Sequence, residues 1–269
     1  MKRIILSYLI LLTALATAYA QDSVPPVKKD SVAVAGASVA EQAAALYNEA
    51  DFRKAIDLLE KEKDEQLAKG MESAELYYNL GNAYFRVNDL AQARLNYERA
   101  LLLDPGDRDI QHNIDYLSTK LEDKILVADT FFLSIWFNAV QNLLSSDAWA
   151  KTAVVCFLLF IASLVAFFFS KLIIVKKSAF YAGIVLIVIV IFANIFTFRQ
   201  KEKIENRSTA VVMTGSASMV SSPDINSKEL TVLHAGTKVR VTKEDRNWLE
   251  IEIDNGTVGW MQKDKLEII

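Results

Sequence analysis

Residues 74–106 read AELYYNLGNAYFRVNDLAQARLNYERALLLDPG, and this stretch decides the fold of the N-terminal half of the chain. Its apolar residues recur at helical spacing, and no proline interrupts the pattern before Pro105. Gly81 and Ala93 are small where two antiparallel helices must approach each other closely. Asn88-Asp89 marks the turn between them, and Pro105 cannot continue the second helix. The stretch therefore predicts a helical hairpin.

The spacing of large and small residues in this hairpin resembles the tetratricopeptide repeat, a unit of about 34 residues that stacks on its neighbours. The resemblance implies an all-α domain that works through protein–protein contacts. The positions that carry it are Tyr77, Leu80, Gly81, Tyr84, Ala93, Tyr97, Ala100 and Pro105.

Weaker helical signals flank this repeat. Upstream, Ala50–Ala55 matches the turn and the start of a second helix, which continues through Lys61–Lys69, and Ala43 takes the small position of the first helix. Downstream, Asp107–Lys124 is amphipathic but lacks a full repeat, so we expect a capping helix. The predicted repeat domain spans residues 39–125, near the minimum size for a stable stack.

The first helices of such repeats line a concave groove, and the helical phase predicts which side chains face it. Asn and Arg can bond a peptide backbone or carboxylate, while Tyr and Phe offer contact area at low entropic cost. The alternative for Tyr78 and Phe85 is packing against the helix of the neighbouring repeat. The candidate partner-binding residues are Glu75, Tyr78, Asn82, Phe85 and Arg86.

The N-terminus has the pattern of a secretory signal peptide. A basic start precedes the apolar run Ile4–Leu12 and the exit Ala18-Tyr19-Ala20, so cleavage is expected after residue 20. No cysteine follows the run, which excludes a lipoprotein signal. The alternative is an uncleaved anchor, although the run is short for a span. Residues 21–38 are rich in Ser, Val, Ala and Pro and predict a flexible linker.

Two later apolar runs predict a transmembrane hairpin. Residues 148–170 and 179–198 each offer about 20 residues, the length that crosses the hydrocarbon of a bilayer. The short loop 171–178 between them carries three lysines, and such loops stay in the cytoplasm. No ionisable group lies deep in either run, which disfavours a transporter.

The segment 126–147, before the first run, is predicted to be an amphipathic helix in the membrane interface. Between Thr130 and Ser146 it has no charge, and an apolar stripe that includes Trp136 opposes a polar side. It is too short and too polar for a confident span, and a third span is the alternative.

The signal peptide and the lysine loop together predict the topology. Both place the two soluble domains on the exported side of the inner membrane, in the periplasm. Arg199, Lys201 and Lys203, in the predicted linker 199–206, argue mildly against this orientation.

Residues 207–269 change to an alternating pattern that is rich in β-branched residues. Turn signals at Ser222-Pro223-Asp224, Ala235-Gly236 and Asp254-Asn255-Gly256 separate five or six short strands, which predicts a small closed barrel.

This segment resembles a bacterial SH3 domain, most specifically through its Gly-x-x-Gly-Trp element. Ser221 replaces the arginine usual after the first valine, which puts a ligand role at that place in doubt. The tryptophans could form a ligand platform, but we predict that both are mainly core. The residues that carry the resemblance are Gly236, Trp248, Gly256, Gly259 and Trp260.

No residue pattern predicts catalysis, a cofactor or a metal. The single cysteine, Cys156, lies in an apolar run, and His112 and His234 stand in different domains without ligand spacing. Phosphate loops and nucleophile motifs are absent from the sequence. The net charge of −3 gives no reason to expect nucleic-acid binding. We therefore predict that the protein is not an enzyme.

The order of the modules resembles the BatE family of the Bacteroides aerotolerance operon. The resemblance implies a periplasmic scaffold beside von Willebrand A-domain membrane proteins and, indirectly, a MoxR-type ATPase. A second hypothesis is a cell-wall anchor whose SH3-like barrel binds peptidoglycan. Under both, the contacts expected are protein partners, membrane lipid and, for the second, the cell wall.

Overall fold

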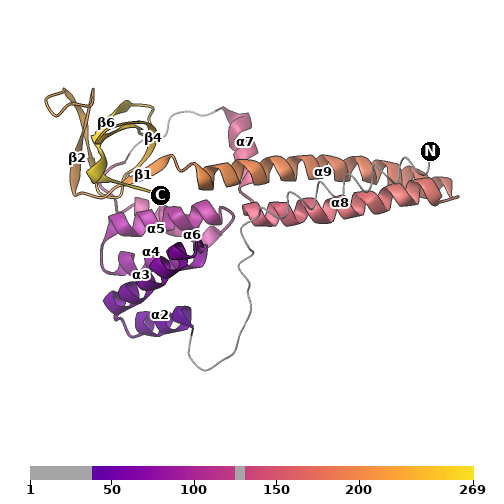
Figure 1. The fold of residues 1–269 in the computed structure, drawn as a ribbon, viewed down its shortest axis with the longest axis horizontal. Coiled ribbons are helices and arrows are strands. Elements are labelled where there is room, and N and C mark those ends of the chain that lie inside the picture. Colours follow the sequence, from indigo (N-terminus) through magenta and orange to yellow (C-terminus); the bar gives the residue numbers. More distant parts are fainter. Residues whose placement is uncertain (1–37, 125–130) are drawn as a thin grey trace. The chain divides into compact units, whose positions relative to one another are not determined.

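The computed structural model describes residues 38–124 and 131–269. The predicted signal peptide and nearly all of the predicted linker lie outside the described residues. The described chain forms two compact units, one of residues 147–197 and one of residues 38–124, 131–146 and 198–269. Figure 1 labels many of their elements.

The repeat domain consists of five helices, each begun by a side chain that suits a helix N-terminus. Ser38, Asp51, Ser73, Asp89 and Asp107 each accept a hydrogen bond from a backbone N–H in the following turn. The helices are α2 (Val39–Asn48), α3 (Phe52–Ala68), α4 (Ala74–Arg86), α5 (Leu90–Leu103) and α6 (Arg108–Ser118).

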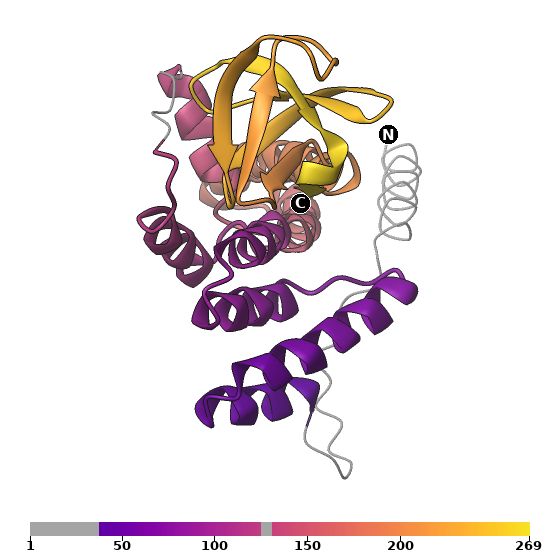
Figure 2. The same ribbon diagram turned by 90° about the vertical axis from the view of Figure 1, so that its left-hand side faces the viewer.

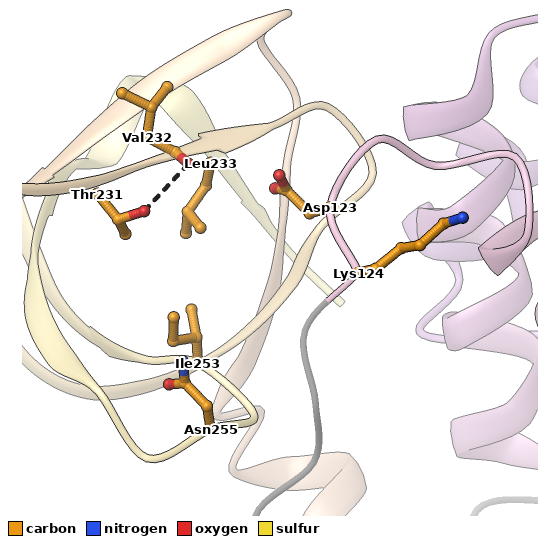
Figure 3. Close-up of a pocket in the computed structure, with 7 residues that line it drawn as sticks. All are labelled: Asp123, Lys124, Thr231, Val232, Leu233, Ile253 and Asn255. Carbon is orange, nitrogen blue, oxygen red and sulfur yellow. Dashed lines mark hydrogen bonds between the residues drawn. The ribbon is translucent and has the colours of Figure 1, made fainter.

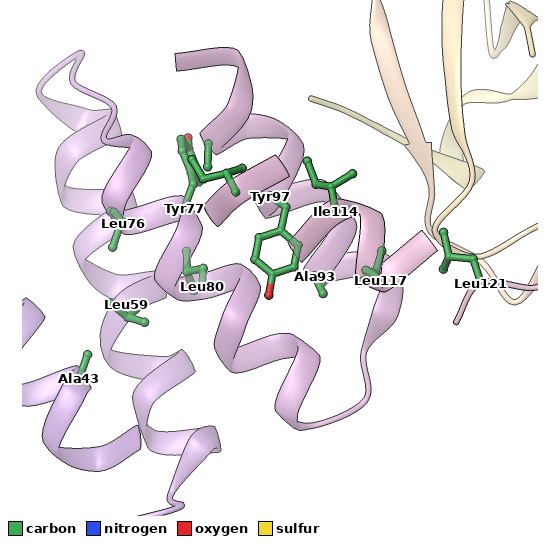
Figure 4. Packing of buried hydrophobic residues seen from close by; sticks show 12 residues of the cluster. Ala43, Leu59, Leu76, Tyr77, Leu80, Ala93, Tyr97, Ile114, Leu117 and Leu121 are labelled. Carbon is green, nitrogen blue, oxygen red and sulfur yellow. The ribbon is translucent and has the colours of Figure 1, made fainter. Parts of the chain in front are cut away.

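Packing inside the repeat follows the predicted phase. A Cβ atom at Gly81 would lie 2.5 Å from Cδ1 of Tyr97, so only glycine lets α4 and α5 approach this closely. Ala93 and Leu80 are fully buried beside this contact (Figure 4). Ala43, the small residue expected in the upstream copy, is buried as well. The expected extension of that copy's second helix is α3, whose 17 residues end at Ala68.

Seven strands curl around a second core to form the SH3-like barrel (Figure 2). All pairings are antiparallel, in the order β3-β2-β6-β5-β4-β1-β7. The alternating pattern predicts five or six strands, and the barrel contains seven. The strands are β1 (Thr209–Val212), β2 (Ser216–Val220), β3 (Glu229–His234), β4 (Lys238–Asp245), β5 (Trp248–Glu252), β6 (Val258–Gln262) and β7 (Leu266–Ile268).

The two apolar runs form α8 (Ser146–Phe169) and α9 (Ile173–Glu205), which pack side by side (Figure 1). The hydroxyl of Ser163 donates to the carbonyl of Ala179, and the rings of Trp149 and Phe196 lie 4.9 Å apart. Both helices are long and apolar enough to cross a membrane. The helix α9 is longer than the predicted span, because most of the predicted loop 171–178 and linker 199–206 continues it as helix.

Candidate functional site

Two of the predicted groove residues, Tyr78 and Asn82, join α4 to α6. Asn113 on α6 donates from Nδ2 to Oδ1 of Asn82 at 2.9 Å and to the hydroxyl of Tyr78 at 3.2 Å. The hydroxyl of Tyr97, whose pKa is raised by burial, donates to the same Asn82 oxygen at 2.7 Å. Asn82 therefore joins α4 to both α5 and α6 through its side-chain oxygen, independently of any partner.

The remaining groove candidates differ in accessibility. Phe85 is half-buried with its ring 5.7 Å from that of Tyr116, as the packing alternative expects. Glu75 and Arg86 are exposed. The guanidinium of Arg86 stacks 4.5 Å from the ring centre of Phe52, which holds the cation in place at the surface. Such a cation suits a peptide carboxylate or carbonyl.

The opposite side of the repeat, on α5, packs against the barrel. Leu95 is fully buried with Val211 of β1 and with Ile269, and Leu102 and Met213 border this cluster. Sequence analysis did not find this interface between the repeat and the barrel.

A buried carboxylate lies inside this interface. Oε2 of Glu98 accepts from Nζ of Lys238 at 2.6 Å, and Oε1 accepts from Nε of Arg94 at 2.9 Å. Burial would raise the pKa of Glu98, but the two cations outweigh it and hold the pKa below its ordinary value. The carboxylate stays ionised and links the repeat to β4.

A second carboxylate joins the end of the repeat domain to the barrel. Oδ2 of Asp123 accepts from the backbone N–H of His234 at 2.7 Å and from the hydroxyl of Thr237 at 2.6 Å. Oδ1 lies 2.7 Å from Nδ1 of His234. Burial works against ionisation, but these hydrogen bonds lower the pKa of Asp123. Its hydrogen bond and charge raise the pKa of His234.

Further pairs extend the interface at its edges. Arg99 donates to Glu267 at 3.0 Å and to the carbonyl of Ile268 at 2.8 Å, and Arg207 pairs with Glu72. Gly236 faces Leu121 so closely that a Cβ atom would lie 2.6 Å from it. The repeat and the barrel thus form one continuous body.

A hollow of about 460 Å³ opens beside Asp123 (Figure 3). Its walls are otherwise Lys124 and residues of β3 and of the β5–β6 turn. The carboxylate of Asp123 is already engaged by His234 and Thr237, and the wall offers no nucleophile paired with a base. Across residues 38–124 and 131–269, no cluster of three His, Cys, Asp or Glu side chains could hold a metal.

The structure corrects the prediction that Trp248 and Trp260 are mainly core. Strand alternation puts Leu249 and Met261 inside the barrel, at 2% and 0% exposure, so the tryptophans lie on the outer face. Both are half-buried and become diagonal neighbours, because Trp248 pairs with Gln262 and Trp260 with Glu250.

The glycines of the signature serve the backbone. Gly236 and Gly256 adopt φ angles of 88° and 87°, which side chains disfavour. A Cβ atom at Gly259 would lie 2.7 Å from Cγ of Met219, so glycine lets β6 approach β2.

Comparison with known families agrees with both modules. Residues 74–107 match the tetratricopeptide repeat, and residues 219–267 match the bacterial SH3 domain. A search of curated proteins found no match to the chain. By fold and by these matches, the chain is a helical-repeat and SH3-like protein with two apolar helices between its modules. Both modules are of kinds that typically bind proteins or cell wall rather than catalyse reactions.

Proposed function

We propose that the protein is a membrane-anchored scaffold that presents the repeat and the barrel together on the exported side of the inner membrane. The packing of α5 on β1 carries the proposal. These elements are separated in sequence by α8 and α9, each able to cross a membrane. Domains in direct contact share one side, so the chain must cross an even number of times. Two spans satisfy this requirement, and a third span would break it.

The signal-peptide pattern and the lysines of residues 171–178 support the exported side for both domains. The resemblance to the BatE family supports the partners: von Willebrand A-domain membrane proteins, with a MoxR-type ATPase acting indirectly. In this proposal the partner contacts the groove side of the repeat, where Glu75 and Arg86 are exposed. The barrel covers the other side.

Labelling of single cysteines tests the topology. In a Cys156→Ala background, Glu75→Cys and Asp254→Cys probe the repeat and the barrel, and Lys176→Cys probes the connection between the spans. We expect an impermeant maleimide to label the first two in cells with an opened outer membrane, and the third only after lysis. Unequal labelling of repeat and barrel would overturn the hairpin. Labelling of Lys176→Cys alone would keep the hairpin and reverse its orientation.

Crosslinking and affinity purification from membranes test the partner. We expect Arg86→Ala to reduce recovery of von Willebrand A-domain proteins about tenfold, the effect of losing a charged contact. Arg53→Ala, an exposed arginine on α3, is the matched control. Equal recovery with both variants would remove Arg86 from the binding site.

One observation favours cell-wall binding as a second candidate function. The outward position of Trp248 and Trp260 gives the barrel an aromatic surface, which suits a ligand better than core packing would. If peptidoglycan is the ligand, Trp248→Ala should abolish co-sedimentation of the full-length protein with purified sacculi. Arg86→Ala should leave it unchanged.

A further inference from the structure

The short helix α7 (Phe132–Gln141) exposes an unusual amount of apolar surface. Trp136 is 70% exposed, and no charged residue occurs from position 131 to 146. Soluble surfaces rarely leave so many large apolar side chains together in water. The exposed group comprises Phe131, Phe132, Leu133, Ile135, Trp136 and Leu143.

The end of α7 is clamped to the part of α9 beyond the apolar run. Nε2 of Gln200 donates to the carbonyls of Gln141 and Leu144, at 2.8 and 2.9 Å. Nε of Arg199 donates to Oε1 of Gln141 at 3.1 Å, and its guanidinium lies 5.3 Å from the ring centre of Phe137. Gln141 and Gln200 are both buried, so their hydrogen bonds are shielded from water.

The position of the clamp along the chain fixes its level at the membrane. Arg199 directly follows Phe198, the last residue of the apolar run, and Lys201 and Lys203 come next. Cations that flank a span lie among the lipid headgroups. On the other side, α8 begins at Ser146, a few residues after Gln141. If α8 and α9 cross the bilayer, the end of α7 therefore lies at headgroup level.

The phase of the helix directs the apolar side away from the protein. At 3.6 residues per turn, Gln141 falls with Ser134 and Asn138 on one side, and Trp136 lies roughly opposite. The clamp holds the polar side. The apolar side therefore faces the upper part of the acyl chains, which is the apolar part of the bilayer next to the headgroups.

We propose that α7 lies on the bilayer surface with its apolar face between headgroups and acyl chains, and that the clamp to Arg199 and Gln200 holds it at this depth. The occupant of the apolar face is lipid. The proposal rests on the membrane hairpin but is independent of the side and of the partners proposed above.

Tryptophan quenching in reconstituted vesicles tests it, after flotation has verified insertion. The difference in emission between the wild type and Trp136→Phe reports Trp136, and the Trp248→Phe difference serves as the control outside the bilayer. We expect a bromine label near the head of the acyl chain to quench Trp136 more than one near its tail, and neither to quench Trp248. Stronger quenching by the tail label would mean that α7 spans. Accessibility to aqueous acrylamide, or protection without lipid quenching, would overturn the lipid as occupant.

A second variant tests the clamp. Gln200→Leu removes both hydrogen bonds to the end of α7, so the contrast between head and tail labels at Trp136 should diminish. Asn194→Leu is the matched control, because this amide on α9 donates to the carbonyl of Val190 in its own helix. Equal contrast in both variants would show that the clamp does not set the depth of α7.

Discussion

The two sides of the central repeat are built from different chemistry. On the groove side, α4 meets α6 through neutral amides and phenols around Asn82, with exposed Arg86 nearby. On the α5 side, the barrel covers Leu95 and the ionised, buried Glu98. This side suits a permanent contact, because separating the repeat from the barrel would break the bond between Glu98 and Lys238 and expose Leu95 and Val211 to water. The groove side, where Arg86 is exposed, suits a partner that binds transiently.

Removal of the buried carboxylate should have the largest effect. In Glu98→Ala, Arg94 and Lys238 lose their shared partner inside the interface. Removing one partner from a buried ionic group costs about 3–5 kcal/mol. We expect about 3 kcal/mol here, because Lys238 is partly exposed. Thermal unfolding in detergent should show the repeat and the barrel both melting earlier. Glu75→Ala, an exposed acid on α4, should leave the midpoint unchanged, and equal midpoints for both variants would contradict the interface.

The second largest effect is expected from overpacking between α4 and α5, in the interior of the repeat. In Gly81→Leu, the new side chain collides with the ring of Tyr97, and such insertions cost about 2 kcal/mol. Circular dichroism at a helical wavelength should show the loss, since the collision lies inside the repeat. Ala44→Leu, on the exposed side of α2, is the control. A midpoint equal to that of the control would mean that α4 and α5 are not in this contact.

A smaller effect is expected on the groove side. Asn82→Ala leaves the buried hydroxyl of Tyr97 without its acceptor and removes one of the two hydrogen bonds of the Asn113 amide, a cost of about 1–2 kcal/mol. Urea unfolding would measure it. The variant should lose stability even without a partner, whereas Arg86→Ala should lose binding alone. No difference in stability between the two variants would mean that the hydrogen bonds of Asn82 do not stabilise the repeat.

The smallest effect is a dependence on pH. The pKa of His234 is raised, so its contribution is complete below the ordinary value of 6.5 and disappears as pH rises through the folded-state pKa. The pKa of Asp123 is lowered, so its contribution is present above the ordinary value of 3.8 and disappears as pH falls through the folded-state pKa. Stability should therefore be greatest in mildly acid solution. In His234→Gln the decline toward alkaline pH should vanish, and its persistence would assign that decline elsewhere.

Local physics made the repeat and most strands predictable. Gly81 and Ala93 predict a close contact between two helices, because a larger side chain at either position would not fit between them. The turn residues Gly236 and Gly256 mark changes of direction that side chains resist. In each case the residues nearby in sequence are sufficient to predict the local structure.

The rest depends on contacts between distant segments. β7 has only three residues and exists because β1 pairs with it, and β2 has a serine-rich pattern that carries little strand preference. Glu98 looks like one more charge on a solvated helix until Lys238 is placed against it. The outward turn of Trp248 follows from pairing register, which hydrophobicity alone does not reveal.

The contact between α5 and β1 also sets an order of events during biogenesis. The chain is synthesised from its N-terminus, so the repeat is complete well before β1 and β4 emerge, and in the proposed topology α8 and α9 must be inserted into the membrane in between. Throughout that interval Leu95 and Glu98 face solvent, and the repeat is a substrate for proteases and chaperones. If α8 and α9 form the proposed membrane hairpin, only a chain whose hairpin returns the barrel to the compartment of the repeat can cover these two residues. Correct membrane integration thereby becomes a condition for the survival of the first domain.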